Sequence, residues 1–332
     1  MSNQPPIEVP QGAIRLNTDS QRLEFFAQDR WYEMATDVPT LDGGARGLAY
    51  RAGGSNTIDV ITIPTSGNAT DFGNATTTAG GRHTAASRTR SIAAGGGTPT
   101  RINTIEFSTF STTGNGQDFG DLTVVGAGGA QMGMSNQTRG VFGGRTTPGN
   151  SNTIDYITIA STGDAQDFGD QGNTEGGMNC FSSPTRGIMG GAHPANTPRI
   201  EFITIATTGN SQEFGSLMHD QELSAAASSA TRGVWMGGRY APSPTNMSTI
   251  QYVQIQSLGN SMEFGDLTSV RNDSGGMSDC VRAVCYGGGN PDGQVDTIEY
   301  ISISTGGTAI DFGNANHSQG YACTSNGHGG LG

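Results

Sequence analysis

The sequence predicts an all-β protein: a six-bladed β-propeller closed by its C-terminal strand, preceded by a small N-terminal β-module. Three observations predict this fold. The chain of 332 residues contains 53 glycines, and glycine costs roughly 1 kcal/mol at each helix-interior position. Hydrophobic residues make up 33 % of the chain, and glycine raises the apolar share to that of an ordinary globular protein. A motif recurs six times at intervals of 46 to 50 residues, which indicates a repeat architecture.

Residues 1–37 differ from the rest and are expected to form a β-module ahead of a propeller of residues 38–332. Short strands are predicted at residues 12–17, 22–26 and 30–34, separated by turns. Three strands of this length cannot bury a core by themselves. We therefore expect the module to dock on the propeller, on copies of itself or on another protein.

The most regular part of each repeat is a pair of strands, as in residues 152–159 and 162–169. β-Branched and aromatic residues dominate the first strand, a Thr-Gly type of turn follows, and a short Asp-Phe-Gly strand ends the pair. The separation between the first Ile and the Phe is 14 residues in all six copies. The copies lie at Ile58/Phe72, Ile105/Phe119, Ile154/Phe168, Ile200/Phe214, Ile250/Phe264 and Ile298/Phe312.

Two further strands complete each repeat. A strand that ends on glycines, such as Arg139–Gly144, precedes each pair, and the stretch before it, such as Met178–Pro184, supplies a fourth strand. Four strands per repeat, buried against neighbouring repeats, are typical of a propeller blade. The first blade has no room for its fourth strand between Leu41 and Arg46, whereas Gly320–Asn326 is a spare strand. We therefore expect the C-terminal strand to complete the first blade and remove an exposed edge.

These motifs resemble known repeats. A strand that ends in Gly-Gly, then an apolar strand and an aromatic residue, resembles the kelch repeat of galactose-oxidase-like propellers over residues 44–332, although Phe replaces the usual tryptophan. The run Asn-Thr-Ile-Asp-Tyr-Ile-Thr-Ile with Asp-Phe-Gly-Asp looks like repeats in virion structural proteins of tailed phages, particularly marine cyanophages. The pattern Gly-x-Ile-Arg-Leu-Asn-Thr-Asp-Ser resembles a small β-module of phage tail-fibre proteins. The resemblance implies a virion protein, assembled in the host cytoplasm.

Composition excludes several functions. All 17 basic residues are Arg, and the absence of lysine removes the P-loop, pyridoxal-phosphate and protein-kinase chemistries that need one. The net charge of −12 argues against nucleic acid as a partner, because phosphate neutralisation supplies most of that affinity. No apolar run is long enough for a membrane span, and the first residues lack the basic and apolar regions of a secretory signal.

Residues that recur in every repeat are interpreted as blade architecture rather than as a site. These are the acid of Asp-Phe-Gly, an acid or Gln in the apolar strand and an Arg before the Gly-Gly strand, which are expected to form hydrogen bonds. No carboxylate pair stands out for glycosidase chemistry, and the five His and four Cys form no metal-binding pattern. We expect Cys180, Cys280 and Cys323 in the fourth strands of their blades and Cys285 in the Gly-Gly strand, all as reduced thiols. We expect no catalytic residue, no cofactor and no metal site, while calcium bound by dispersed loop carboxylates stays an alternative.

Loop length varies on one face of the predicted propeller. The separation from the Gly-Gly pair to the next Ile ranges from 4 to 12 residues, whereas the Ile-to-Phe separation is constant. These two connections leave a four-stranded blade at opposite ends. Because binding residues concentrate on loops held by a rigid scaffold, we expect a partner here; the alternative is drift of unconstrained loops. The candidate binding residues are Arg101, Arg145, His193, Arg239, Tyr240 and Asp292.

These observations favour a non-enzymatic phage virion protein, associated with the tail as a fibre, receptor-binding or adaptor component. The expected partners are other tail proteins, bound through the N-terminal module, and a host surface receptor, with the chain forming a homo-oligomer on the particle. Two alternatives stay open: a structural or decorating virion subunit without a receptor role, and a carbohydrate-binding or carbohydrate-active propeller. Tyr240 is the one aromatic residue found in the variable loops, which favours protein contacts over sugar binding.

Overall fold

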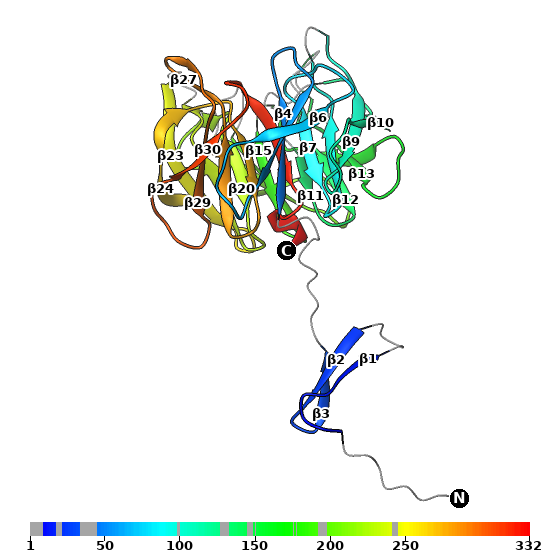
Figure 1. Cartoon of the computed structure of the whole chain (residues 1–332). Coiled ribbons are helices and arrows are strands. Elements are labelled where there is room, and N and C mark those ends of the chain that lie inside the picture. The colour runs from blue at the N-terminus through cyan, green and yellow to red at the C-terminus, as the bar shows by residue number, and fades with distance from the viewer. Residues whose placement is uncertain are drawn as a thin grey trace, which may run out of the picture. The chain divides into compact units, whose positions relative to one another are not determined.

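The computed structural model of the chain (Figure 1) describes residues 9–17, 22–33, 45–97, 100–126, 133–144, 149, 151–174, 176, 178–191, 198–240 and 245–332. The chain divides into two compact units, residues 1–43 and residues 44–332. This division falls a few residues beyond the boundary at residue 37 that the sequence predicts. Each unit is described by itself.

The first unit contains a three-stranded antiparallel sheet of β1 (Ile14–Asn17), β2 (Arg22–Ala27) and β3 (Arg30–Glu33). The strands form close to where the sequence predicts them. Phe25 stands opposite Ile14 on one side and Tyr32 on the other, and the Phe25 and Tyr32 rings stack with centroids 5.5 Å apart. Ile14 is 64 % exposed, since three strands of this length cannot bury both faces of their own sheet.

The second unit contains, among the described residues, six antiparallel sheets of four or more strands, numbered here in chain order of their second strand. Sheet one is β31 (Tyr321–Ser325), β4 (Arg46–Arg51), β5 (Thr57–Thr62) and β6 (Thr70–Asn74). Sheet two is β7 (His83–Ala86), β8 (Arg90–Ala94), β9 (Thr104–Thr109) and β10 (Gln117–Asp121). Sheet three is β11 (Gly133–Ser135), β12 (Arg139–Phe142), β13 (Thr153–Thr158) and β14 (Gln166–Asp170).

The remaining sheets follow the same order of strands. Sheet four is β15 (Asn179–Ser182), β16 (Arg186–Gly190), β17 (Arg199–Thr204) and β18 (Gln212–Ser216). Sheet five is β20 (Ala225–Ser228), β21 (Arg232–Met236), β23 (Thr245–Gln254) and β24 (Met262–Arg271), extended by β22 (Arg239–Tyr240) and β19 (Gln221–Glu222). Sheet six is β25 (Gly275–Ser278), β26 (Arg282–Tyr286), β29 (Thr297–Ser302) and β30 (Ile310–Asn314). A hairpin of β27 (Gly289–Asn290) and β28 (Gly293–Gln294) and a 3-10 turn, η1 (Gly329–Leu331), complete the unit.

The prediction of an all-β protein is confirmed, and the second unit is propeller-like (Figure 1). The first strand of each sheet contacts that of the next, from β7 through β11, β15, β20 and β25 to β31, and β31 contacts β7. The last strand of the chain, β31, also pairs with β4 from the start of the unit. No helix among the described residues is long and apolar enough to cross a membrane.

The core lies between the sheets. Among the described residues, the buried apolar side chains form six clusters, each joining two neighbouring sheets. Between sheets two and three, for example, Phe119 of β10 packs in one cluster with Ile157 of β13 and with Ile159. Because each sheet is covered on both faces, its central strands carry apolar residues on both sides, as the sequence predicts.

The Asp-Phe-Gly motif forms part of the contact between adjacent sheets. Its Phe is buried, and the Phe119 carbonyl of sheet two accepts a hydrogen bond from the Gly163 amide of sheet three at 2.8 Å. Gly120 has φ +150°, and a Cβ there would collide with the Gly163 carbonyl, so only glycine fits. The sequence suggests that the acids of the motif form hydrogen bonds within the blade, but the structure leaves their side chains exposed. These acids are Asp71, Asp118, Asp167, Glu213, Glu263 and Asp311.

The recurring Arg joins each sheet to the next. In sheet three, Nη1 of Arg139 donates to the Ile205 carbonyl of sheet four at 2.8 Å, and its guanidinium lies over the Tyr156 ring at 4.4 Å. A charge-assisted bond and a cation–π contact thus act on one side chain. The equivalent bonds run from Arg46 to Phe110, Arg90 to Ile159, Arg186 to Ile255, Arg232 to Ile303 and Arg282 to Ile63.

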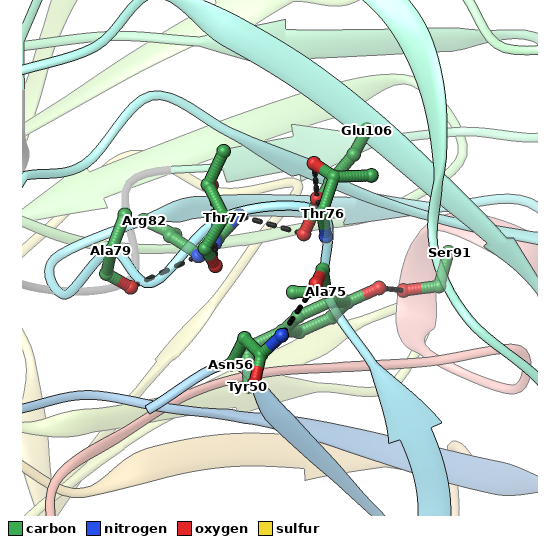
Figure 2. Close-up of polar contacts among 9 residues, drawn as sticks. All are labelled: Tyr50, Asn56, Ala75, Thr76, Thr77, Ala79, Arg82, Ser91 and Glu106. Atoms are coloured by element: carbon green, nitrogen blue, oxygen red, sulfur yellow. Dashed lines mark hydrogen bonds and ion pairs between the residues drawn. The ribbon is translucent and has the colours of Figure 1, made fainter. Parts of the chain in front are cut away.

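A buried acid in the third strand of a sheet holds the connection that arrives from the preceding sheet. Figure 2 shows this around Glu106 of β9, which accepts bonds from the Thr76 amide at 2.6 Å and from Nη1 of Arg82 at 2.7 Å. Arg82 is 2 % exposed, and Glu106 is 1 % exposed. The prediction that these acids are architectural is confirmed; Asp59, Asp155, Glu201 and Glu299 accept equivalent bonds, and Gln251 takes their place in sheet five.

The cysteines are all free thiols. Cys180, Cys285 and Cys323 lie buried in β15, β26 and β31, as the sequence predicts. The prediction for Cys280 is wrong: it lies after β25, in the turn that leads to β26, with φ +69°.

Candidate functional site

The variable loops leave the sheets at one end. Each joins the second strand of its sheet to the third, whereas the Thr-Gly type of turn joins the third to the fourth at the opposite end. We call the end that carries the six variable connections the variable-loop face. The chain enters the unit at the other end, where the Arg46 amide donates to Asn326 Oδ1 at 2.7 Å, just before η1.

On sheets five and six the variable loops are themselves β structure. β23 and β24 are ten residues long, and β22 pairs with both β19 and β23. The hairpin β27–β28 joins them, because Nδ2 of Asn246 donates to the Gly289 carbonyl at 3.2 Å and Asn272 pairs with Gly289. We call this assembly of β19, β22, β27, β28 and the extended ends of β23 and β24 the β-platform.

The β-platform brings together three of the six residues that the sequence singles out. Arg239 and Tyr240 form β22, and Asp292 is exposed in the β27–β28 turn, where its amide donates to Asn290 Oδ1 at 2.9 Å. Arg101 lies apart, in the loop of sheet two, bridged to Gly97. Arg145 and His193 lie outside the described residues.

Arg239 has a structural partner that sequence reasoning missed. Its Nε donates to Oε1 of Glu222 at 2.7 Å, and the two side chains are 31 % and 2 % exposed. The pairing of β19 with β22 brings together two residues that are 17 positions apart in the sequence, so no local motif predicts their contact. The ion pair fixes β22 and leaves Tyr240, 36 % exposed, as the aromatic residue of the β-platform.

The β-platform exposes aromatic, aliphatic and charged side chains. Exposed side chains on it include Val270 at 36 % and Tyr240, with the carboxylates of Asp266 and Asp292. Among the described residues, no group of three His, Cys, Asp or Glu side chains could hold a metal ion. A rigid sheet with one aromatic, one aliphatic and several charged groups suits recognition of another protein.

A second feature, which sequence reasoning also missed, lies on the axis of the sheets. Serines at one equivalent position of the innermost strands form what we call the serine ladder: Ser135, Ser182, Ser228, Ser278 and Ser325. Each of the last four donates its hydroxyl to the carbonyl of the one before it, at 2.7 to 2.8 Å. They line a cavity of about 40 Å³ together with His328. Each serine lies four residues before a recurring Arg or at the equivalent place, so aligning the innermost strands would have found it.

Comparison with known proteins adds no relative: no protein-family profile matches the chain, and no curated protein sequence matches it.

Proposed function

We propose that this chain is a non-enzymatic protein of a phage particle, associated with the tail, in which a closed six-bladed kelch-like propeller presents the variable-loop face to a partner. One observation carries the proposal. The recurring Arg, the buried acid and the Gly of Asp-Phe-Gly are all engaged between sheets, whereas Tyr240 and Asp292, which do not recur, are exposed on the β-platform. The assignment to a phage rests on the resemblance of the repeat.

Closure into six blades is supported by contacts that link each sheet to the next and the last sheet to the first. The innermost strands contact one another from β7 to β31 and back to β7, and the Arg bonds pass from sheet one through sheet six to Ile63 of sheet one. The pairing of β31 with β4 joins the two ends of the second unit. In such a ring no sheet is left with one face uncovered.

The first unit is proposed as the attachment segment, bound to other tail proteins and to copies of itself on the particle. Its sheet exposes Ile14 and Phe25 at 64 % and 36 %, which suits a surface that is covered in the assembly. The virion, formed in the host cytoplasm, is the proposed location.

Two experiments test the proposal. Mass spectrometry of purified particles of the phage that encodes this sequence is expected to detect the chain at a fixed ratio to known tail proteins. The purified full-length chain is expected to compete with phage adsorption to host cells, because it carries the receptor-contacting face. The double variant Tyr240→Ala, Asp292→Ala should lose this competition.

A matched control separates the variable-loop face from the outer rim. Asp167→Ala with Gln166→Ala removes exposed side chains of β14 and should compete as well as the unchanged chain. Presence in particles with no competition would instead favour a decorating subunit without a receptor role. Competition that free sugars abolish would favour a carbohydrate-binding propeller. Absence from particles would contradict the proposal.

A further inference from the structure

The serine ladder has one gap, and the end of the chain fills it. Ala86 of β7 occupies the position that serine holds in the other five innermost strands. At this gap the hydroxyl of Ser135 lies 3.1 Å from Nε2 of His328, and the same nitrogen lies 3.2 Å from the Ala86 carbonyl. The Ala86 amide also donates directly to Oγ of Ser135 at 3.0 Å. The imidazole therefore contacts two adjacent members of the ladder at once.

The hydrogen bonds of His328 fix its protonation state. Nδ1 accepts a bond from the Gly330 amide at 3.1 Å, so the proton of the neutral imidazole is on Nε2 and points to the Ala86 carbonyl. The bond to Gly330 also caps η1, since His328 is its N-cap residue. A second proton would have to bind at Nδ1, where it would face the Gly330 N–H, a donor against a donor.

The surroundings of the segment also oppose a positive charge. Nη2 of Arg88 donates to the Leu331 carbonyl at 2.7 Å, which places a cation on the same segment as His328. Burial lowers the pKa of His328 to about 4, and the positive charge of Arg88 acts in the same direction. The hydrogen bond to the Ala86 backbone raises this pKa and offsets part of the shift.

The other titratable groups that face the segment are an acid and three thiols. One of the thiols is Cys323, which lines the cavity with His328 and whose pKa is raised by burial. The Asp279 carboxylate accepts bonds from the Val281 and Arg282 amides, and the Cys280 thiol donates to the Gly327 carbonyl at 3.2 Å. The strands that pack on η1 are β11, β15 and β20, and they present ladder serines and the thiol of Cys180. Burial raises the pKa of Cys180 and of Cys280, so both thiols stay neutral.

We propose that residues 326–332 form a proton-sensitive latch, in which neutral His328 holds the C-terminal turn in the gap of the serine ladder and protonation of the imidazole releases the turn from the axis. Release opens the axial cavity on the face where β4 begins, because Asn326 is bonded to Arg46 there. The rest of the axis keeps its own serine-to-carbonyl bonds, so the latch moves without unfolding the sheets.

Hydrogen–deuterium exchange of the full-length chain, corrected for the intrinsic pH dependence of exchange, tests the latch. Because opening takes up one proton, the protection of a peptide that covers residues 326–332 should fall by up to about tenfold for each pH unit between 6.5 and 4. Peptides from β15 and β20 should keep their protection over the same range.

Three variants make the test specific. His328→Gln keeps a donor for Ala86 and an acceptor for Gly330, so its segment should stay protected with no pH dependence. His328→Ala should lose protection at every pH. The matched control His317→Gln changes an exposed histidine and should behave as the unchanged chain.

Two results would overturn the latch. One is protection of residues 326–332 that does not change between pH 6.5 and 4 in the unchanged chain. The other is a pH dependence that persists in His328→Gln, which would assign it to another group such as the buried His83. Nitrogen NMR of the imidazole gives an independent readout, because the latch requires the proton on Nε2 at neutral pH.

Discussion

The interfaces between the sheets and the variable-loop face use the repeat in opposite ways. At the interfaces the same bonds recur from sheet to sheet: an Arg to a carbonyl, a buried acid to the arriving connection, and a Gly against a Gly carbonyl. On the variable-loop face the loops differ in length, and only sheets five and six build the β-platform among the described residues. The difference teaches that recurrence marks packing between sheets, whereas the exposed Tyr240 and Asp292 of the β-platform depart from the repeat.

Removing a buried charge between two sheets should cause the largest loss of stability. Arg82→Ala leaves the Glu106 carboxylate, 1 % exposed, without its cation, and we expect a loss of about 3 to 5 kcal/mol in the free energy of unfolding. Urea denaturation measures it. Arg101→Ala, at an exposed Arg of the variable-loop face, is the control and should stay within about 0.5 kcal/mol. Equal effects of the two variants would erase the distinction between the regions.

Adding a methyl group at the glycine of Asp-Phe-Gly should cause the second-largest loss of stability. Gly120→Ala places a Cβ against the Gly163 carbonyl at φ +150°, and we expect a loss of about 2 to 3 kcal/mol from strain and overlap. Gly163→Ala has a similar φ of +153° but open space, so it should lose only about 1 kcal/mol. Thermal unfolding of the pair separates overlap from backbone strain, and a larger loss for Gly163→Ala would contradict this account of the motif.

Acid should weaken the protein through His328. Its pKa in the folded chain, about 4, lies below the ordinary value of 6.5, so the folded state favours the neutral imidazole. The stabilisation is complete above pH 6.5 and is lost as pH falls towards 4. The full shift corresponds to about 3 kcal/mol, and because the side chain is partly accessible we expect about 2 kcal/mol, measured as the difference between the unchanged chain and His328→Gln.

The smallest change in stability should come from the β-platform. Tyr240→Ala combined with Asp292→Ala removes exposed side chains, so the free energy of unfolding should change by about 0.5 kcal/mol or less, while competition with phage adsorption is lost. Chemical denaturation and the adsorption assay on one preparation measure both. A large loss of stability would show that these residues belong to the scaffold.

Much of the fold follows from the sequence because its constraints are local and repeated. The constant separation of Ile and Phe fixes the third and fourth strands, and the Gly at the end of Asp-Phe-Gly marks a close approach of two backbones. The contact of Arg239 with Glu222 and the place of His328 in the axis depend on pairings between distant segments, which no spacing reveals. Ala86 stands out only after the innermost strands are aligned, because the other five strands carry serine at its position.

A cryo-EM reconstruction of particles of the phage that encodes this chain tests the central claim most directly. The account predicts a ring of six sheets on the tail, with the variable-loop face and its β-platform directed away from the particle. A ring whose variable-loop face is buried against a neighbouring subunit, or particles that lack such a ring, would contradict it.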